Sequence, residues 1–412
     1  MTAMNYYIID AQAPLVFRSG KPFGAQAGAS DANFPLPSSS AGLMRHQYMR
    51  HHNIGLTEAG EQNRGTLTEA NYQALLNVPT FGSLLVRFTM DHPQDFTVLV
   101  PKPSNAMYLK VSSDGATEAK ITIVRLAPSA VDYEDCGTDL PAGLQPVQAC
   151  SDDQNFKGKP QKGANFWRLE DFLGWQSGRD LDFAIISAHG LDSIPIDIRT
   201  HVAIDDDSLS SEDGQLFQTA GLDLGATRRP HHQGWDELQL GFLTGIAAPL
   251  GKQTKAADTL VRFGGEGRLS TMIEVTNEAD TTLAVPKHLD DDIKANGGLL
   301  ITLLTPAIFA NGFLPAWLDP TTLEGTLPQS TTNVRLKAAA VDRWQPVSGW
   351  DLQHFKPKAM RKAVPAGAVY WFELLSPEVD ASSAWLSCIS DDPQDCRDSF
   401  GVAIIHPRQP SK

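Results

Sequence analysis

The chain has 412 residues, of which 42% are hydrophobic and 20% are charged, so it can bury a sizeable core and is not expected to be disordered along its length. Its formal net charge is −14, which excludes a protein that coats nucleic acid by bulk electrostatics, because phosphate affinity depends on clustered Lys and Arg. A nucleic-acid site would have to be a local basic groove or one shared with partner subunits. No apolar run approaches the length of a membrane span and no signal-peptide pattern is visible, so we expect a cytoplasmic protein without a membrane partner.

The first expected elements are a strand and a helix. Residues 5–9, NYYII, are aromatic and β-branched and predict a strand. A helix is expected to begin just after Pro37, capped by a serine, and to end by Gly55. Its apolar face leaves Arg45 and His46 on the other side together with further basic residues, so we expect an exposed basic face.

Two blocks rich in β pattern follow. Short apolar or alternating runs between residues 80 and 126, and again between 194 and 275, predict strands. The stretch 127–165 between them is rich in Pro, Asp, Gly and Gln and predicts a long mobile loop. A buried strand pattern starts again after residue 285. We therefore expect two α+β halves, 1–285 and 286–412, each opened by a buried strand.

Residues 259–270, TLVRFGGEGRLS, place three glycines after an apolar strand. Gly264, Gly265 and Gly267 predict a turn that needs positive φ or a very close backbone approach. The simplest interpretation is a hairpin turn in which Glu266 and Arg268 form a local ion pair. The spacing fits neither of the glycine-rich nucleotide-binding patterns, so no cofactor is expected.

A basic cluster precedes an aromatic run near the carboxyl end. Lys356, Lys358, Arg361 and Lys362 come shortly before the sequence Tyr-Trp-Phe at 370–372. Cations that hold phosphates beside aromatic faces that stack bases are typical of sites for single-stranded nucleic acid. The alternative is that the three aromatic residues belong to the core and the lysines are simply solvated.

No motif for a catalytic nucleophile stands in a convincing context, so the chain is not expected to be an enzyme. Cleavage of RNA by histidine needs no motif and stays open, with His46 as the candidate. The acidic triplets at 205–207 and 290–292 lack EF-hand spacing, and the four cysteines form no CxxC pair. We expect no metal, and reduced thiols, with a disulfide between Cys388 and Cys396 left open.

Six segments in one order resemble a known family. They are FRSGKPFG at 17–24, FPLPSSSAGLMR at 34–45, HVAID followed by GQLF at 201–217, RFGGEGR at 262–268, SGWDL at 348–352 and PKAMRKAVPAGAVYWFEL at 357–374. Together they are similar to the third subunit of the Cmr effector complex, a RAMP superfamily protein of type III-B CRISPR systems. The resemblance covers nearly the whole chain.

The resemblance implies an α+β fold of two ferredoxin-like, RRM-related halves with irregular β-rich insertions. It also implies a non-catalytic, RNA-binding subunit that caps the 5′ tag of the CRISPR RNA in antiviral defence. Such a subunit would link the large polymerase-like subunit to the backbone RAMP subunits and meet the target RNA indirectly. The alternative is a metal-independent RAMP endoribonuclease that processes CRISPR precursor RNA, with His46 as general acid or base.

The residues expected to contact RNA follow from the positions of the shared segments. RAMP proteins carry a glycine-rich loop near the carboxyl terminus, where this chain has a single glycine in DSFGVAII. The expected contacts are Arg18, Lys21, Arg45, Gly264, Gly265, Arg268, Lys358, Arg361 and Gly401.

Overall fold

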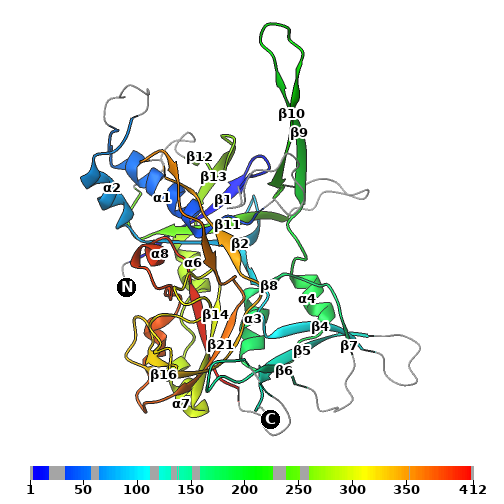
Figure 1. Ribbon diagram of the computed structural model, residues 1–412, viewed down its shortest axis with the longest axis vertical. Helices are drawn as coiled ribbons and strands as arrows, with labels where there is room; N and C mark the ends of the chain where they lie inside the picture. Colours follow the sequence, from blue (N-terminus) through cyan, green and yellow to red (C-terminus); the bar gives the residue numbers. More distant parts are fainter. Residues whose placement is uncertain are drawn as a thin grey trace.

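The computed structural model describes residues 3–17, 33–56, 65–111, 120–130, 137, 139–150, 158–225, 238–250, 259–351 and 353–409. Two large antiparallel sheets form the body, and smaller two- and four-stranded sheets extend from it (Figure 1). The fold is thus mixed α and β, with antiparallel pairing in every sheet. Within these ranges, no helix is both long and apolar enough to span a bilayer.

The first large sheet has seven strands, with β1 (Asn5–Ala11) near its middle. The order is β12-β13-β1-β11-β2-β3-β8. The other strands are β2 (Thr80–Thr89), β3 (Thr97–Pro101), β8 (Phe166–Arg168), β11 (Leu238–Ile246), β12 (Leu260–Arg262) and β13 (Leu269–Glu274). After its first residue β1 is buried throughout, because β11 and β13 flank it and its apolar side chains face packed layers.

Helix α1 (Pro37–His51) packs against β2 and β11. It begins at Pro37, whose fixed φ and missing N–H suit the first helical position. No side chain caps its first turn, so the expected serine cap is wrong although the start of the helix is confirmed. The short helix α2 (Glu69–Leu76) follows and is capped by the Thr68 hydroxyl, which accepts from Asn71 N–H.

The second large sheet has the order β15-β16-β21-β14-β22. Its strands are β14 (Gly298–Leu303), β15 (Glu324–Thr326), β16 (Asn333–Ala340), β21 (Val369–Leu374) and β22 (Ala403–Pro407). Every residue of β14 is buried. Helix α7 (Leu289–Asn296) covers β14 and β22, while α6 (Thr276–Thr282) lies against β1. A 3-10 turn (Ala381–Ala384) and α8 (Pro393–Arg397) precede β22.

The expectation of a structureless loop over 127–165 is wrong for the part of that stretch that the structure describes. Strands β6 (Val147–Ala149) and β7 (Gly158–Pro160) lie within it and pair with β5 (Lys120–Pro128) and β4 (Ala106–Val111) in a four-stranded sheet. Helices α3 (Leu169–Gln176) and α4 (Phe183–His189) follow. The two strands are too short to show alternation, and distant pairing partners define them.

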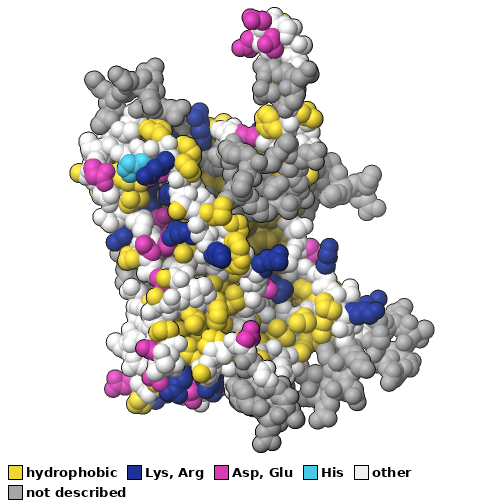
Figure 2. Space-filling view, viewed as in Figure 1, with side chains coloured by type: hydrophobic (Ala, Val, Ile, Leu, Met, Phe, Trp, Pro, Cys, Tyr) yellow, Lys and Arg dark blue, Asp and Glu magenta, His cyan; other side chains and the backbone are white. Residues whose placement is uncertain are grey.

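Strands β9 (Ile196–Ile204) and β10 (Ser211–Leu222) form a hairpin that projects far from the body (Figure 1). Aliphatic side chains on one face of it, those of Ile198, Val202 and Ile204, are exposed. The turn carries the acidic triplet at 205–207, and acidic side chains gather at this tip in Figure 2. The hairpin is therefore apolar along its side and negatively charged at its end.

One hydrophobic cluster joins the two large sheets. It contains Ile8 and Trp167 from the first sheet and Ile301 and Phe372 from the second, all at most 1% exposed. Burying side chains of this size contributes about 1.5–3 kcal/mol each. In sequence, the last strand of the seven-stranded sheet ends at Glu274 and the first strand of the five-stranded sheet begins at Gly298. Because the two sheets share one core, the expected division of the chain into two halves near residue 285 stays a prediction.

Candidate RNA interface

A long, bent hairpin carries the whole of the predicted basic cluster. We call residues 343–363 the basic arm. Its strands β17 (Gln345–Val347) and β20 (Arg361–Ala363) pair at the base, and β18 (Trp350–Asp351) and β19 (Lys356–Pro357) pair toward the end. The arm reaches α2, where the Gln353 amide accepts from Leu67 N–H at 3.1 Å and donates to Leu67 C=O at 2.7 Å. In Figure 1 it is the orange ribbon that rises beside α1.

The basic arm brings cations and aromatic surface together. Lys356, Lys358 and Lys362 are exposed. Trp344 and Trp350 are 50% and 55% exposed. The Lys362 ammonium lies 5.1 Å from the centre of the Trp344 ring, within range of a cation–π contact. Figure 2 shows Lys and Arg side chains beside apolar patches across the middle of the molecule.

The hypothesis that the Tyr-Trp-Phe run at 370–372 stacks bases is wrong. Tyr370, Trp371 and Phe372 are 1%, 4% and 1% exposed, because β21 lies between β14 and β16 with both faces covered. The aromatic surface beside the lysines comes instead from Trp344 and Trp350, which the sequence analysis missed. A usable signal was present, since both tryptophans stand in the short segment just before the lysines.

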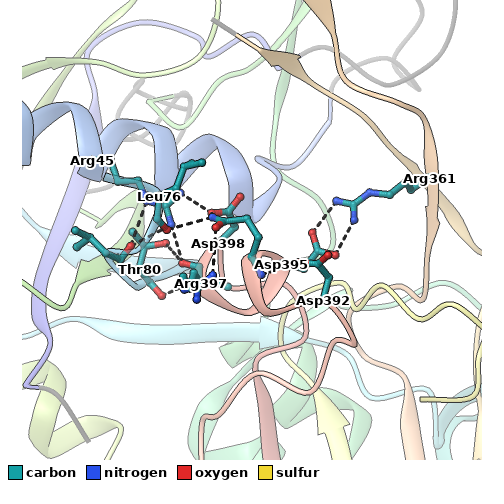
Figure 3. A network of polar contacts seen from close by, with 11 residues as sticks. Arg45, Leu76, Thr80, Arg361, Asp392, Asp395, Arg397 and Asp398 are labelled. Carbon is teal, nitrogen blue, oxygen red and sulfur yellow. Dashed lines mark hydrogen bonds and ion pairs between the residues drawn. The ribbon is translucent and has the colours of Figure 1, made fainter. Parts of the chain in front are cut away.

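Arg361 is engaged by the protein. Its two terminal nitrogens each donate to a different carboxylate oxygen of Asp395 on α8, both at 2.7 Å (Figure 3). Burial raises the pKa of Asp395, and the Arg361 guanidinium opposes that rise. The hydrogen bond to Asp395 in turn raises the pKa of Arg361. Arg361 therefore ties the basic arm to α8, while 43% of its side chain stays exposed.

Arg45 is buried, so the expectation that it lies on an exposed basic face is wrong. Its guanidinium pairs with Asp398, donates to Val78 C=O at 3.0 and 3.2 Å and to Arg397 C=O at 3.2 Å (Figure 3). The side chains of Arg45 and Asp398 are 9% and 10% exposed. This arrangement gives Arg45 a structural role and leaves its guanidinium little surface for RNA.

Residues in α8 and just after it continue this junction. Ser399 Oγ donates to Thr80 C=O at 2.6 Å, and Thr80 Oγ1 donates to Arg397 C=O at 3.0 Å. Gln394 Nε2 donates to Leu76 C=O at 3.3 Å. We call these contacts, with the pairs Arg45–Asp398 and Arg361–Asp395, the α8 network. It fastens α1, α2 and β2 to the second sheet and to the basic arm.

The glycine turn lies against the strand extension near residue 17. Gly264 has φ +80°, and a Cβ there would stand 2.9 Å from Val16 C=O. Gly265 N–H donates to the same carbonyl at 2.8 Å, and Phe17 packs edge-on against Phe263 with ring centres 5.0 Å apart. The predicted close backbone approach is thus confirmed within the fold.

The predicted ion pair in this turn is also confirmed. Arg268 donates to Glu266 at 2.6 Å, and the turn joins β12 to β13 as a hairpin. Arg18 and Lys21 lie outside the described residues. The contact of Val16 and Phe17 with the turn nonetheless brings the start of one shared segment beside another, although the two are far apart in sequence.

Gly264→Ala should lower the free energy of unfolding by about 1–3 kcal/mol, because alanine at positive φ is strained and its Cβ meets Val16 C=O. Gly42→Ala is the matched control. Gly42 lies in α1 with no atom within 4 Å of an added Cβ, so alanine there should stabilise by about 0.5–1 kcal/mol. Urea unfolding measures both, and equal effects would contradict the strained turn.

Gly401 is confined by the protein. It has φ +83°, and a Cβ there would stand 2.8 Å from Ser390 Oγ. Its N–H donates to Pro306 C=O at 2.7 Å and its C=O accepts from Ile389 N–H at 2.9 Å. Packing accounts for glycine at this position, and its contact with RNA stays a prediction.

A second basic patch lies on the other side of α1 from Arg45. His46 and Arg50 are exposed on α1, and Arg262 is exposed on β12. Partial burial of the ring, together with the charges of Arg50 and Arg262, lowers the pKa of His46. The separation from Arg45 follows from helix geometry, since consecutive residues point about 100° apart.

A cavity of about 350 Å³ lies between the two large sheets. Its lining is mainly apolar and includes Phe34, Pro37, Phe166, Pro306, Pro346 and Pro365. Pro346 belongs to the basic arm, so the cavity opens beside it. Among the described residues, no three His, Cys, Asp or Glu side chains are placed to hold a metal ion, and Cys388 and Cys396 are free thiols.

Comparison with known protein families shows the class of protein to which this chain belongs. Residues 7–406 match the model of the family described as CRISPR-associated protein (Cas_Cmr3). The chain therefore belongs to this family. It is a Cmr subunit of a type III CRISPR effector complex. No curated protein matches the sequence.

Two solved structures show distant likenesses to this chain. A chain of the type III-B Cmr-beta complex bound to cognate target RNA and AMPPnP is 13% identical, with 89% of this chain and 86% of that one covered and a TM-score of 0.42. A chain of the Csm3–Csm4 subcomplex of a type III-A interference complex is 10% identical, with 98% and 100% covered and a TM-score of 0.35.

Proposed function

We propose that this chain is a non-catalytic RNA-binding subunit that caps the 5′ tag of the CRISPR RNA. In that role it would join the large polymerase-like subunit to the backbone subunits in the cytoplasm, and meet target RNA through the assembly. The observation that carries the proposal is the basic arm. Five Lys or Arg and one Asp occupy residues 343–363, in a chain whose net charge is −14.

We also propose that each large sheet is built on a ferredoxin-like unit. Each sheet contains four neighbouring strands, β13-β1-β11-β2 and β22-β14-β21-β16, in which the last strand of the set lies beside the first and all neighbours are antiparallel. Helix α1 follows β1 in the first set, and α8 precedes β22 in the second. This repeated order supports two related halves.

Replacing Lys356, Lys358 and Lys362 together by alanine should weaken binding of a 5′-tagged CRISPR RNA. It should also make the loss of affinity with added salt less steep, by about 0.7 in the log–log slope for each phosphate contact removed. The measurement is the dissociation constant of the assembled complex at several salt concentrations.

The control for this variant is Lys287→Ala with Lys294→Ala. Both lysines are exposed, and they lie at α7, far from the basic arm in Figure 1. Their removal should leave affinity and slope unchanged. An equal loss in the two variants would mean that bulk charge binds the RNA and that the basic arm is not a site.

Photo-crosslinking of the tagged RNA within the assembled complex tests the function as a whole. Crosslinked peptides from residues 262–268 or 343–363 would support capping of the tag. A chain that joins the complex and never crosslinks would be a protein spacer.

The endoribonuclease alternative rests on His46. Burial and the charges of Arg50 and Arg262 lower the pKa of His46, which favours the neutral ring. A neutral imidazole beside two arginines is suited to accepting a proton while the cations stabilise developing charge. Cleavage of a repeat-containing RNA that is lost in His46→Ala and kept in His51→Ala would favour the enzyme. If the full chain does not cleave this RNA, the endoribonuclease alternative is wrong.

A further inference from the structure

We propose that Trp344 and Trp350 stack unpaired bases of single-stranded RNA, so that the basic arm contacts bases as well as phosphates. This inference rests on the proposed RNA-binding function. The two tryptophans would supply the part of the RNA affinity that depends on the bases. Neither tryptophan was among the contacts expected from the resemblance.

The exposure of these two side chains sets them apart from four buried tryptophans in the described part of the chain. Trp167, Trp175, Trp371 and Trp385 are each at most 4% exposed, whereas Trp344 and Trp350 are half exposed. An indole left in water forgoes the stabilisation that its burial would bring. Two such side chains on one arm therefore indicate a surface that a ligand covers.

Strand pairing places Trp350 level with two lysines of the basic arm. Trp350 lies directly opposite Pro357, between Lys356 and Lys358 on the partner strand. Lys358 N–H donates to Gly349 C=O at 2.8 Å, which holds the two strands together beyond the paired residues. At Trp344 the Lys362 ammonium lies beside the indole, and at Trp350 two lysines occupy the neighbouring positions of the partner strand.

The acidic groups near the arm are already engaged. Asp351 accepts from the His354 ring at 2.9 Å and from Gln353 N–H at 3.0 Å, and Asp342 accepts from Ser104 Oγ at 2.9 Å. With five Lys or Arg against one Asp, the arm presents net positive charge together with flat aromatic faces. Single-stranded RNA matches both, since its phosphates meet cations and every base has a face that stacks.

The arm is also held in place before any ligand arrives. Gln353 fastens its end to Leu67, and Arg361 fastens its base to Asp395. A stacking surface that is already ordered loses less entropy on binding. This favours a contact made by the arm as it stands.

Two RNAs of equal length separate stacking from phosphate contacts. One is a fluorescent single-stranded RNA with the 5′ tag, and the other has abasic riboses in the same positions. We expect the assembled complex to bind the first more tightly. Trp344→Ala and Trp350→Ala should each weaken its binding by about tenfold and leave the abasic RNA unaffected, while Trp→Phe at either site keeps most of the affinity.

Met360→Ala is the control, because Met360 is 55% exposed on the same arm and has no aromatic face. A loss with Met360→Ala equal to that with the tryptophan variants would assign the arm to apolar docking of a protein and overturn the proposal. Equal affinity of the wild-type complex for the two RNAs would overturn stacking and leave the RNA-binding function standing. If the complex bound neither RNA, both the stacking proposal and the proposed RNA-binding function would be overturned.

Discussion

Arg45→Ala should lower the free energy of unfolding by about 3–5 kcal/mol. The substitution leaves the Asp398 carboxylate buried without its partner, and an uncompensated buried charge is strongly destabilising. It also removes the donors to Val78 and Arg397 that help to fasten the two sheets. Urea or thermal unfolding of the purified chain measures the loss.

Arg50→Ala is the matched control for Arg45, since Arg50 lies on the same helix and is exposed. It should change the free energy of unfolding by no more than about 0.5 kcal/mol. Replacing both charged partners, with Arg45→Met and Asp398→Leu, should be less damaging than Arg45→Ala alone. Similar effects of Arg45→Ala and Arg50→Ala would show that the buried pair is not formed.

Phe372→Ala should also lower the free energy of unfolding by about 3–5 kcal/mol, because it opens a cavity in the core shared by the two sheets. Phe372 is stacked with Trp317 at 5.7 Å between ring centres. Trp350→Ala, on the exposed arm, should change stability by no more than about 0.5 kcal/mol. A larger loss of stability with Trp350→Ala than with Phe372→Ala would mean that the aromatic side chains of β21 are the exposed ones and could stack bases.

Local sequence signals predicted the parts of this fold that depend on neighbours in the chain. The buried strand at β1, the helix after Pro37 and the glycine turn at 264–268 all follow from residue type and spacing. In the turn, the φ of +80° at Gly264 and the Glu266–Arg268 pair are decided within five residues. Such features do not need the rest of the protein to be specified.

Other features depend on contacts between distant segments and could not be predicted. Arg45 and Asp398 are 353 positions apart, and a basic residue on a helix gives no sign that a carboxylate from the other half will bury it. The exposure of Trp350 and the burial of Trp371 have the same cause. Sheet order places one tryptophan on an outlying hairpin and the other in a central strand.

The hairpin of β9 and β10 has its own consequence for the lifetime of the protein outside its complex. Within the described part of the chain these strands form a sheet of two, and a lone pair of strands is only marginally stable in water. At its base, Leu222 exchanges two backbone hydrogen bonds with Leu15, at 2.8 and 2.9 Å. Amide hydrogen exchange should therefore be fast from the tip down and slow sharply at Leu222. A protease should nick the isolated chain at this tip, and a partner that covers the aliphatic face would protect it.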